Sequence, residues 1–188
     1  MRKVVARELV SLDGVVEGPQ GWAFSYSNDE MEEANASGMA ASDAMLLGRA
    51  TYEEFASYWP YQDSAEQPYT DYLNNTPKYV VSTTLEDPLG WQNSTLIKGN
   101  VVEGISALKH QPGKDITVIG SGALVQSLLQ NDLLDELVLS VHPIVLGSGK
   151  RLFEDGGDRK ALKLVDSKTF DTGVVVLSYR PMGKDAEA

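Results

Sequence analysis

Cysteine is absent from this 188-residue chain. The absence of cysteine therefore excludes disulfide frameworks, thiolate nucleophiles and cysteine-ligated zinc or iron–sulfur sites. Histidine is almost as scarce, because only His110 and His142 occur. Two imidazoles are too few for a three-histidine metal site, and they give no convincing Ser-His-Asp order. We expect neither a metal ion nor a catalytic triad.

Positive charge is also in short supply. The chain has 16 Lys and Arg residues against 27 Asp and Glu, which gives a formal net charge of −11. Such an acidic surface repels polyanions, so we expect no nucleic-acid partner.

No run approaches the roughly 18 consecutive apolar residues of a membrane-spanning helix, and the N-terminus has no signal-peptide pattern. We expect a cytoplasmic protein that has no membrane partner.

The length fits one domain, at roughly 150 residues per domain. Hydrophobic residues make up 42% of the chain, which is ordinary for a protein that buries a core. We expect a single domain over residues 1–181 and a flexible tail over residues 182–188.

The apolar pattern alternates between strand-like and helix-like segments. Short β-branched or apolar runs predict strands at 3–10, 44–47, 79–81, 95–97, 116–119 and 134–141. Runs at 162–170 and 174–179 predict a closing antiparallel hairpin. Cap spacings predict helices after Ser27, Thr51 and Asn100, and another helix covers 124–129. This alternation predicts an α/β fold with a mainly parallel sheet covered on both faces.

Three strand ends in the middle of the chain carry small or hydroxyl residues. They are Gly48-Arg49-Ala50-Thr51, Ser82-Thr83-Thr84 and Gly120-Ser121-Gly122-Ala123. Ligands of open α/β sheets collect at the carboxyl ends of the strands, so we expect these turns to face one crevice. The third turn suits a diphosphate best, because its glycines allow close approach and the next helix offers free N–H groups. The alternative is a glycine-rich turn without a ligand, since Val125 replaces the third glycine of G-x-G-x-x-G.

Arg49 stands at the start of a predicted helix, where a positive charge opposes the helix dipole. This placement favours contact with an anion such as a phosphate. The alternative is an exposed arginine that extends into water. For Ser82 and Thr83 the alternative is a simple turn cap.

Other motifs argue for structural roles. Gly147-Ser148-Gly149-Lys150 superficially resembles a P-loop, but Arg151 occupies the position of the magnesium-binding Ser or Thr, which excludes a nucleoside triphosphatase. His142 lies among apolar residues of a predicted strand, and we expect it to be structural. His110 ends a predicted helix, where the dipole favours it. With so few reactive side chains, we expect a cofactor to supply the difficult chemistry.

Taken together, the motifs resemble those of the dihydrofolate reductase-like family. They are Ser11-Leu12-Asp13-Gly14, residues 46–52 (LLGRATY), 80–84 (VVSTT), 119–124 (IGSGAL) and 142–149 (HPIVLGSG). More narrowly, the chain resembles the branch related to the C-terminal reductase domain of bifunctional riboflavin-biosynthesis deaminase-reductases. The resemblance covers nearly the whole chain in the expected order.

The resemblance implies a dihydrofolate reductase-like three-layer fold, in which helices flank a mostly parallel mixed sheet that ends in an antiparallel hairpin. It also implies NADPH as hydride donor, a small-molecule substrate and a homodimer. Carried over by motif, it places these residues at the cofactor: Gly48, Arg49 and Thr51 beside the phosphates, Ser82 and Thr83 at the adenine ribose, and Gly120, Ser121, Gly122, Ala123 and Leu124 at the diphosphate. Asp13 becomes the candidate polar anchor near the nicotinamide, and the alternative for it is a turn-forming Asp-Gly.

The proton donor and the substrate stay open at this point. Relatives that reduce folate carry an acidic residue on the first helix, but the four acids at 29, 30, 32 and 33 fit a solvated helix face. A pterin, a pyrimidine or another small conjugated C=N or C=O compound fits the resemblance. Trp22, Phe24 and Tyr26 offer either a flat aromatic wall or core packing, and we expect Trp59 in the core.

Two functions follow. The first is an NADPH-dependent reductase similar to the domains that reduce 5-amino-6-(5-phosphoribosylamino)uracil in riboflavin biosynthesis. The second is a catalytically silent nucleotide-binding or scaffolding dimer of the same fold. The chain has no His/Cys/Cys zinc-deaminase segment, which argues against a direct riboflavin assignment, although a lone reductase can act on that pathway.

Overall fold

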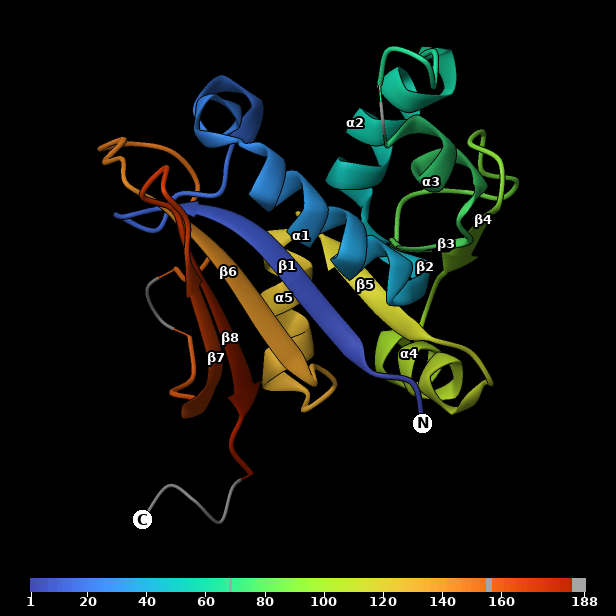
Figure 1. Ribbon diagram of the computed structural model, residues 1–188. Helices are drawn as coiled ribbons and strands as arrows, with labels where there is room; N and C mark the ends of the chain where they lie inside the picture. The colour runs from blue at the N-terminus through green and yellow to red at the C-terminus, as the bar shows by residue number, and fades with distance from the viewer. Residues whose placement is uncertain (68, 155–156, 184–188) are drawn as a thin grey trace.

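A single eight-stranded sheet runs through the molecule (Figure 1). The structure is a computed structural model that describes residues 1–67, 69–154 and 157–183. Its strands are β1 (Val4–Ser11), β2 (Ser42–Gly48), β3 (Lys78–Val81), β4 (Ser94–Ile97), β5 (Asp115–Ile119), β6 (Glu136–His142), β7 (Leu162–Thr169) and β8 (Val175–Pro181). The α-helices are α1 (Asp29–Ala40), α2 (Arg49–Tyr58), α3 (Thr70–Asn75), α4 (Val101–His110) and α5 (Gly122–Gln130). Three short 3-10 helices are η1 (Pro19–Gly21), η2 (Phe24–Tyr26) and η3 (Trp59–Tyr61).

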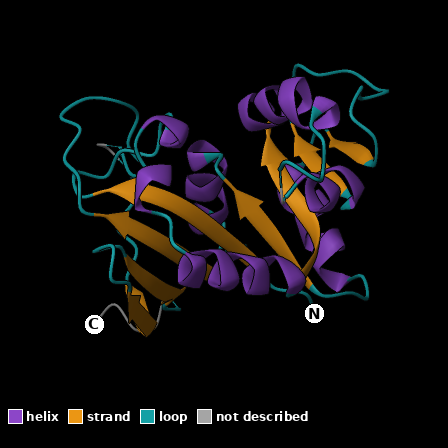
Figure 2. Cartoon of the chain, turned by 45° about the horizontal axis from the view of Figure 1, so that its top comes forward, coloured by secondary structure: helices purple, strands orange, loops and turns teal. Residues whose placement is uncertain are grey.

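The strand order is β4-β3-β2-β5-β1-β6-β8-β7. Strands β1 to β6 pair in parallel, whereas β8 runs antiparallel to both β6 and β7. Helices cover both faces of the sheet, as Figures 1 and 2 show. These features confirm the three-layer fold with a mostly parallel mixed sheet and a closing hairpin.

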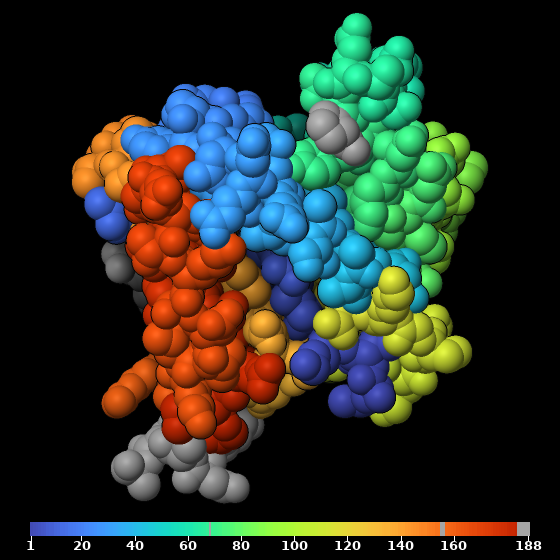
Figure 3. All heavy atoms as spheres, in the orientation of Figure 1, coloured from blue at the N-terminus to red at the C-terminus, as the bar shows by residue number. Residues whose placement is uncertain are grey.

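The core is divided between the two faces of the sheet. Ala44 and Leu46 of β2 pack with the cluster that includes α4 and α5. Met45 and Leu47 pack on the opposite face with residues of α2 and α3. A strand buried on both faces reads as a continuous apolar run, which is why residues 44–47 predicted it well. On the face that carries α2 and α3, Figure 3 shows α1 lying between them and the C-terminal hairpin.

Two of the predicted helix caps were wrong. The cap of α1 is Asn28, whose side-chain oxygen accepts from the Met31 N–H at 2.9 Å, so the helix starts one residue later than Ser27 predicts. Adjacent Ser and Asn residues are nearly equivalent as caps, and the spacing alone does not separate them. Helix α2 begins at Arg49, so Thr51 lies inside the helix. Asn100 caps α4 as predicted and accepts from the Glu103 N–H.

Some elements had too little local signal to predict. Helix α3 has six residues, which is too short for a helical hydrophobic period to show. Val15 forms an isolated antiparallel bridge with Arg151. Residues 184–188 of the predicted tail lie outside the described residues. In the part of the chain that the structure describes, no helix is long and apolar enough to cross a membrane.

Candidate functional site

The turns after β2 and β5 touch each other at the carboxyl end of the sheet. The Gly48 N–H donates to Ser121 Oγ at 3.0 Å, and that hydroxyl donates in turn to Thr51 Oγ1 at 2.8 Å. A side-chain carbon placed on Gly120 would lie 3.4 Å from Thr51. Thr51 therefore uses its hydroxyl to join the two turns, which explains why it does not cap α2. Two of the three predicted turns are therefore in direct contact, and we call this place at the end of the sheet the crevice.

This contact holds two helix N-termini side by side. Gly48 precedes α2 and Ser121 precedes α5, and neither residue makes a side-chain cap bond to its helix. Uncapped first turns leave N–H groups free, and each helix adds the positive end of its dipole. Ser121 also takes a left-handed conformation (φ 64°, ψ 45°), a strained state that surrounding structure must hold in place. Two adjacent helix ends of this kind offer the features that anions bind in proteins, namely free N–H groups and positive dipole ends.

The two glycines of the turn after β5 have different roles. Gly120 has φ +59°, a conformation that side chains disfavour, and it borders Thr51. A side-chain carbon on Gly122 would instead lie 3.6 Å from both Leu152 and Val16. Gly122 thus borders the core, a position that the motif did not predict. Ala123 is exposed and Leu124 is buried against the core.

The turn after β3 is stabilised by hydrogen bonds between its own residues. Ser82 Oγ accepts from the N–H groups of Thr84 at 3.1 Å and Leu85 at 3.0 Å, and Ser82 itself is buried. These bonds fit the turn-cap alternative for Ser82. Thr83 is exposed beside it. Because β3 neighbours β2, this turn lies at the same edge of the sheet as the crevice.

Arg49 occupies the first position of α2, next to the crevice. Its side chain is 52% exposed and pairs with Glu53 at 3.1 Å, one helical turn away. Exposed pairs of this kind contribute little, typically below about 1 kcal/mol. A phosphate can therefore replace Glu53 as the partner of the guanidinium at small cost.

The Asp13 carboxylate joins two loops at the end of β1. It accepts from Ser11 Oγ at 2.7 Å, from the Leu146 N–H at 3.1 Å and from the Gly147 N–H at 2.8 Å. The hydrogen bond from Ser11, with those from Leu146 and Gly147, lowers the pKa of Asp13 to about 2. A carboxylate that is ionised at neutral pH has no proton to give. Asp13 thus ties the two loops together, and it does not suit the role of catalytic acid.

We expect Asp13→Asn to lower stability at neutral pH and to lose this effect in acid. The folded-state pKa of Asp13 lies below its ordinary value, so its carboxylate stabilises the protein above about pH 4 and loses this effect as the pH falls toward 2. Thermal melting of the wild type and the variant between pH 2 and 6 measures the difference. The gap between the two melting curves should narrow as the pH falls. A gap that is constant over this range would contradict the assigned pKa.

Strand β1 extends beyond its neighbour β5. Pairing with β5 ends at Arg7 and Ile119, whereas pairing with β6 continues to Ser11 and His142. On the side of the crevice, residues 8–10 therefore have no strand beside them, whereas the Ser11 N–H donates to Val15 and its carbonyl accepts from Gly14. A ligand with amide groups can occupy this edge without displacing a sheet hydrogen bond.

An aromatic cluster closes the end of β6. His142 is fully buried, with ring contacts to Trp22 and Tyr26 at centroid distances of 5.3 and 5.8 Å. Its Nδ1 lies 2.8 Å from the Ser140 carbonyl oxygen, and burial lowers the pKa of His142. A structural histidine was the expectation, and this setting confirms it. Phe24 is 63% exposed and is the member of the predicted wall that faces solvent most fully.

One buried acid was not singled out from the sequence. Glu8 lies on β1 with only 3% of its surface exposed. The sequence did offer a signal for it, because Glu8 is a charged residue inside the β-branched run at residues 3–10 that predicts a buried strand. Its Oε1 atom has no hydrogen-bond partner in the structure.

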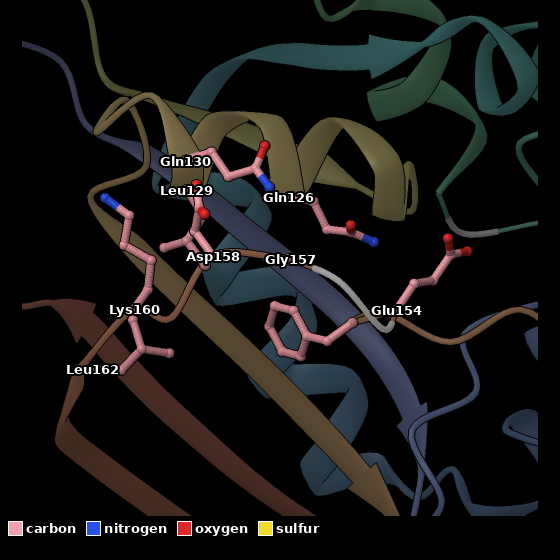
Figure 4. A pocket seen from close by; sticks show the side chains of 9 residues that line it. Gln126, Leu129, Gln130, Glu154, Gly157, Asp158, Lys160 and Leu162 are labelled. Atoms are coloured by element: carbon pink, nitrogen blue, oxygen red, sulfur yellow. The ribbon is translucent and has the colours of Figure 1, made fainter.

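A separate hollow lies on the far side of α5 (Figure 4). It measures about 310 Å³ and is lined by Gln126, Leu129, Gln130, Phe153, Glu154, Gly157, Asp158, Lys160 and Leu162. These residues come from the second half of α5 and from the connection that leads to β7. The hollow is therefore removed from the helix N-termini that form the crevice.

Comparison with protein families gives a match over most of the chain. The family model described as the RibD C-terminal domain matches residues 2–176. Two proteins of Bacillus subtilis (strain 168), both named as uncharacterized, are similar over almost their full length. YyaP is 32% identical over 180 residues, which cover 95% of this chain and 94% of YyaP. YwjB is 31% identical over 179 residues, which cover 92% of this chain and 95% of YwjB.

Solved structures give the same picture. A protein from Shewanella sp. PV-4, whose name links it to riboflavin biosynthesis, superimposes with a TM-score of 0.76 at 26% identity and covers 96% of this chain and 99% of its own. The riboflavin biosynthesis reductase Rib7 of Saccharomyces cerevisiae gives a TM-score of 0.63 at 16% identity, over 96% of this chain and 89% of its own. The second likeness shows the fold alone.

Proposed function

Because this chain belongs to the RibD C-terminal domain family, we propose that it is an NADPH-dependent reductase of the dihydrofolate reductase-like fold. Its substrate would be a small conjugated C=N or C=O compound, with an aminopyrimidine as the first choice. The name of the Shewanella protein, which links it to riboflavin biosynthesis, supports this choice. Pterins and other small heterocycles with a conjugated C=N or C=O bond are the alternative substrates.

The observation that carries the proposal is the pair of uncapped helix N-termini. Bonds from Gly48 to Ser121 and from Ser121 to Thr51 hold them together at the carboxyl end of the sheet. A dinucleotide brings a diphosphate, and two adjacent helix ends provide the N–H groups and dipoles that bind one. The site thus fits the group that the family implies.

Each part of the crevice has a task in this proposal. The turns that contain Gly48 and Gly120 bind the diphosphate, and Arg49 binds the 2′-phosphate that distinguishes NADPH from NADH. Ser82 and Thr83 border the adenosine side. The edge of β1 at residues 8–10, beyond the pairing with β5, binds the nicotinamide amide and orients the ring. When bound, NADPH supplies the hydride, and the protein aligns it with the acceptor and excludes water.

A silent nucleotide-binding dimer is the alternative function. It would bind NADPH through the same turns and would reduce no substrate. The cytoplasmic location and the homodimer stay part of the proposal, and size-exclusion chromatography with light scattering tests the dimer.

We expect Arg49→Ala to weaken NADPH binding about 10- to 100-fold, because a charge-assisted bond to a phosphate contributes about 1.5–3 kcal/mol. NADH lacks the 2′-phosphate, so its affinity should change less than about threefold. Titration of the purified proteins with each nucleotide, followed by tryptophan quenching, measures both constants.

Arg180→Ala provides the matched control. Arg180 is exposed to a similar degree, 54%, and also forms an ion pair, at 3.2 Å from Glu136, but it lies on β8. This variant should bind both nucleotides like the wild type. Equal losses for NADPH and NADH in Arg49→Ala would remove the 2′-phosphate role, and no loss would leave Arg49 as a solvated side chain.

A further inference from the structure

Reduction of a C=N or C=O bond requires a proton as well as a hydride, and this inference rests on the proposed function. The groups at the carboxyl end of β1 are poor proton donors. Asp13 is held ionised by three hydrogen bonds, and burial favours neutral His142, whose Nδ1 is engaged with the Ser140 carbonyl. The donor must therefore come from another group near the crevice.

Glu8 is a carboxyl group without a partner. The side chain is 3% exposed, and Oε1 is buried without a hydrogen bond. Within the part of the chain that the structure describes, no hydrogen bond or ion pair of this side chain forms. Buried carboxylates are normally paired, because an isolated buried charge is costly. An unpaired buried carboxyl is instead stable as the neutral acid.

The sheet register places Glu8 beside the crevice. Arg7 pairs with Ile119, the last residue of β5, so Glu8 stands level with Gly120. Side chains alternate along a strand, and Ala6 belongs to the cluster that packs on α5. Glu8 therefore faces the same side as Ala6, toward the layer in which Gly120 leads into α5. It is also the first residue of β1 beyond the pairing with β5.

No charged group on the packed elements offsets Glu8. Helix α5 has no titratable residue, and the neighbouring side chains of β5 and β6 on this face, Val118, Leu137 and Leu139, are apolar. Two charged residues on the loops beyond the strand end have other partners. Glu17 accepts from the Lys150 N–H, and Arg151 donates to the Asp13 carbonyl. Burial alone raises the pKa of Glu8 well above its ordinary value.

We propose that Glu8 is the proton donor of the reduction. The nicotinamide C–H bond breaks and its electron pair forms the new C–H bond on the acceptor carbon. The π electrons of the C=N or C=O bond move to nitrogen or oxygen, which takes the proton from the Glu8 carboxyl. Glu8 is left as a carboxylate and recovers its proton from solvent. The acceptor is reduced by two electrons and NADPH is oxidised to NADP⁺.

The first test compares wild-type protein with Glu8→Gln, which keeps the shape of the neutral acid. At pH 7 both proteins should bind NADPH within about threefold of each other. With 5-amino-6-(5-phosphoribosylamino)uracil as the acceptor, kcat should fall about 10²- to 10⁴-fold in the variant, as for loss of a general acid, and KM should stay similar. Glu136→Gln, which changes a β6 carboxyl beside Arg180, is the control and should keep wild-type kcat. Turnover of Glu8→Gln within a few-fold of wild type would overturn the proposal.

The second test needs no substrate, so it tests whether Glu8 holds a proton even if that acceptor is not turned over. The folded-state pKa of Glu8 lies above that of the unfolded chain, so wild-type stability should fall as pH rises above about 4.5. Relative to Glu8→Gln, the unfolding equilibrium constant of the wild type should rise by up to about tenfold per pH unit. Parallel stability curves between pH 5 and 8 would show that Glu8 holds no proton and would overturn the inference. Failure of wild-type protein to bind NADPH would instead overturn the proposed function, so the two failures are distinct.

Discussion

Gly120→Val is expected to lower the affinity for NADPH by at least about 100-fold. Gly120 has φ +59°, which for a β-branched residue costs about 1–2 kcal/mol or more. Its new Cβ would lie 3.4 Å from Thr51, and the two added methyl groups would fill the space between the helix ends. A loss of about 3 kcal/mol in binding corresponds to about 100-fold in the dissociation constant. Fluorescence titration with NADPH measures this loss.

Gly90→Val is the matched control for this experiment. Gly90 has ordinary backbone angles, and nothing lies within 4 Å of the place where its side chain would begin. We expect this variant to bind NADPH like the wild type. Circular dichroism of both variants checks that the fold persists. A folded Gly120→Val protein with wild-type affinity would show that the cofactor binds elsewhere.

Lys78→Met is expected to have the largest effect on stability, a loss of about 3 kcal/mol. Lys78 is fully buried, and its Nζ donates to the carbonyl oxygens of Leu73, Asn74 and Thr76 at 2.8, 3.1 and 2.9 Å. The ammonium also lies 4.2 Å from the centre of the Trp91 ring. Each buried carbonyl left without a donor costs about 1–3 kcal/mol, offset in part because the ammonium no longer has to be buried. Desolvation lowers the pKa of Lys78 to about 8, so the group is still mainly charged at pH 7.

Chemical denaturation of Lys78→Met and Lys98→Met separates this effect from loss of a surface charge. Lys98 is 44% exposed and pairs with Glu86, so its removal should cost less than about 1 kcal/mol. Lys78 connects the end of α3 to the start of β3. Stability of Lys78→Met equal to that of Lys98→Met would show that the three carbonyls gain nothing from the buried ammonium.

The strands were predictable because burial on both faces leaves a strong local pattern. Residues 44–47 and 116–119 form continuous apolar runs, and both are central strands in the structure. The closing hairpin was readable from the turn at Asp171, Thr172 and Gly173. Helix starts were less certain, because several adjacent polar residues satisfy the same cap spacing, as at Ser27 and Asn28.

The crevice was only partly predictable. The turns at Gly48 and Gly120 stood out in the sequence as small residues at strand ends. Their contact joins Gly48 to Ser121, which is 73 residues away, so no local pattern contained it. The same holds for Asp13, whose carboxylate binds the N–H of Leu146, 133 residues further along the chain. Side-chain roles that depend on such distant partners emerge only from the fold.

Titration of the wild-type protein with NADPH and with NADH tests the central claim most directly. The crevice between α2 and α5, with Arg49 at its edge, predicts saturable binding of NADPH at least about tenfold tighter than that of NADH. Quenching of tryptophan fluorescence and the emission of the bound nicotinamide report the two affinities independently. Absence of binding for both nucleotides to the folded protein would contradict the account.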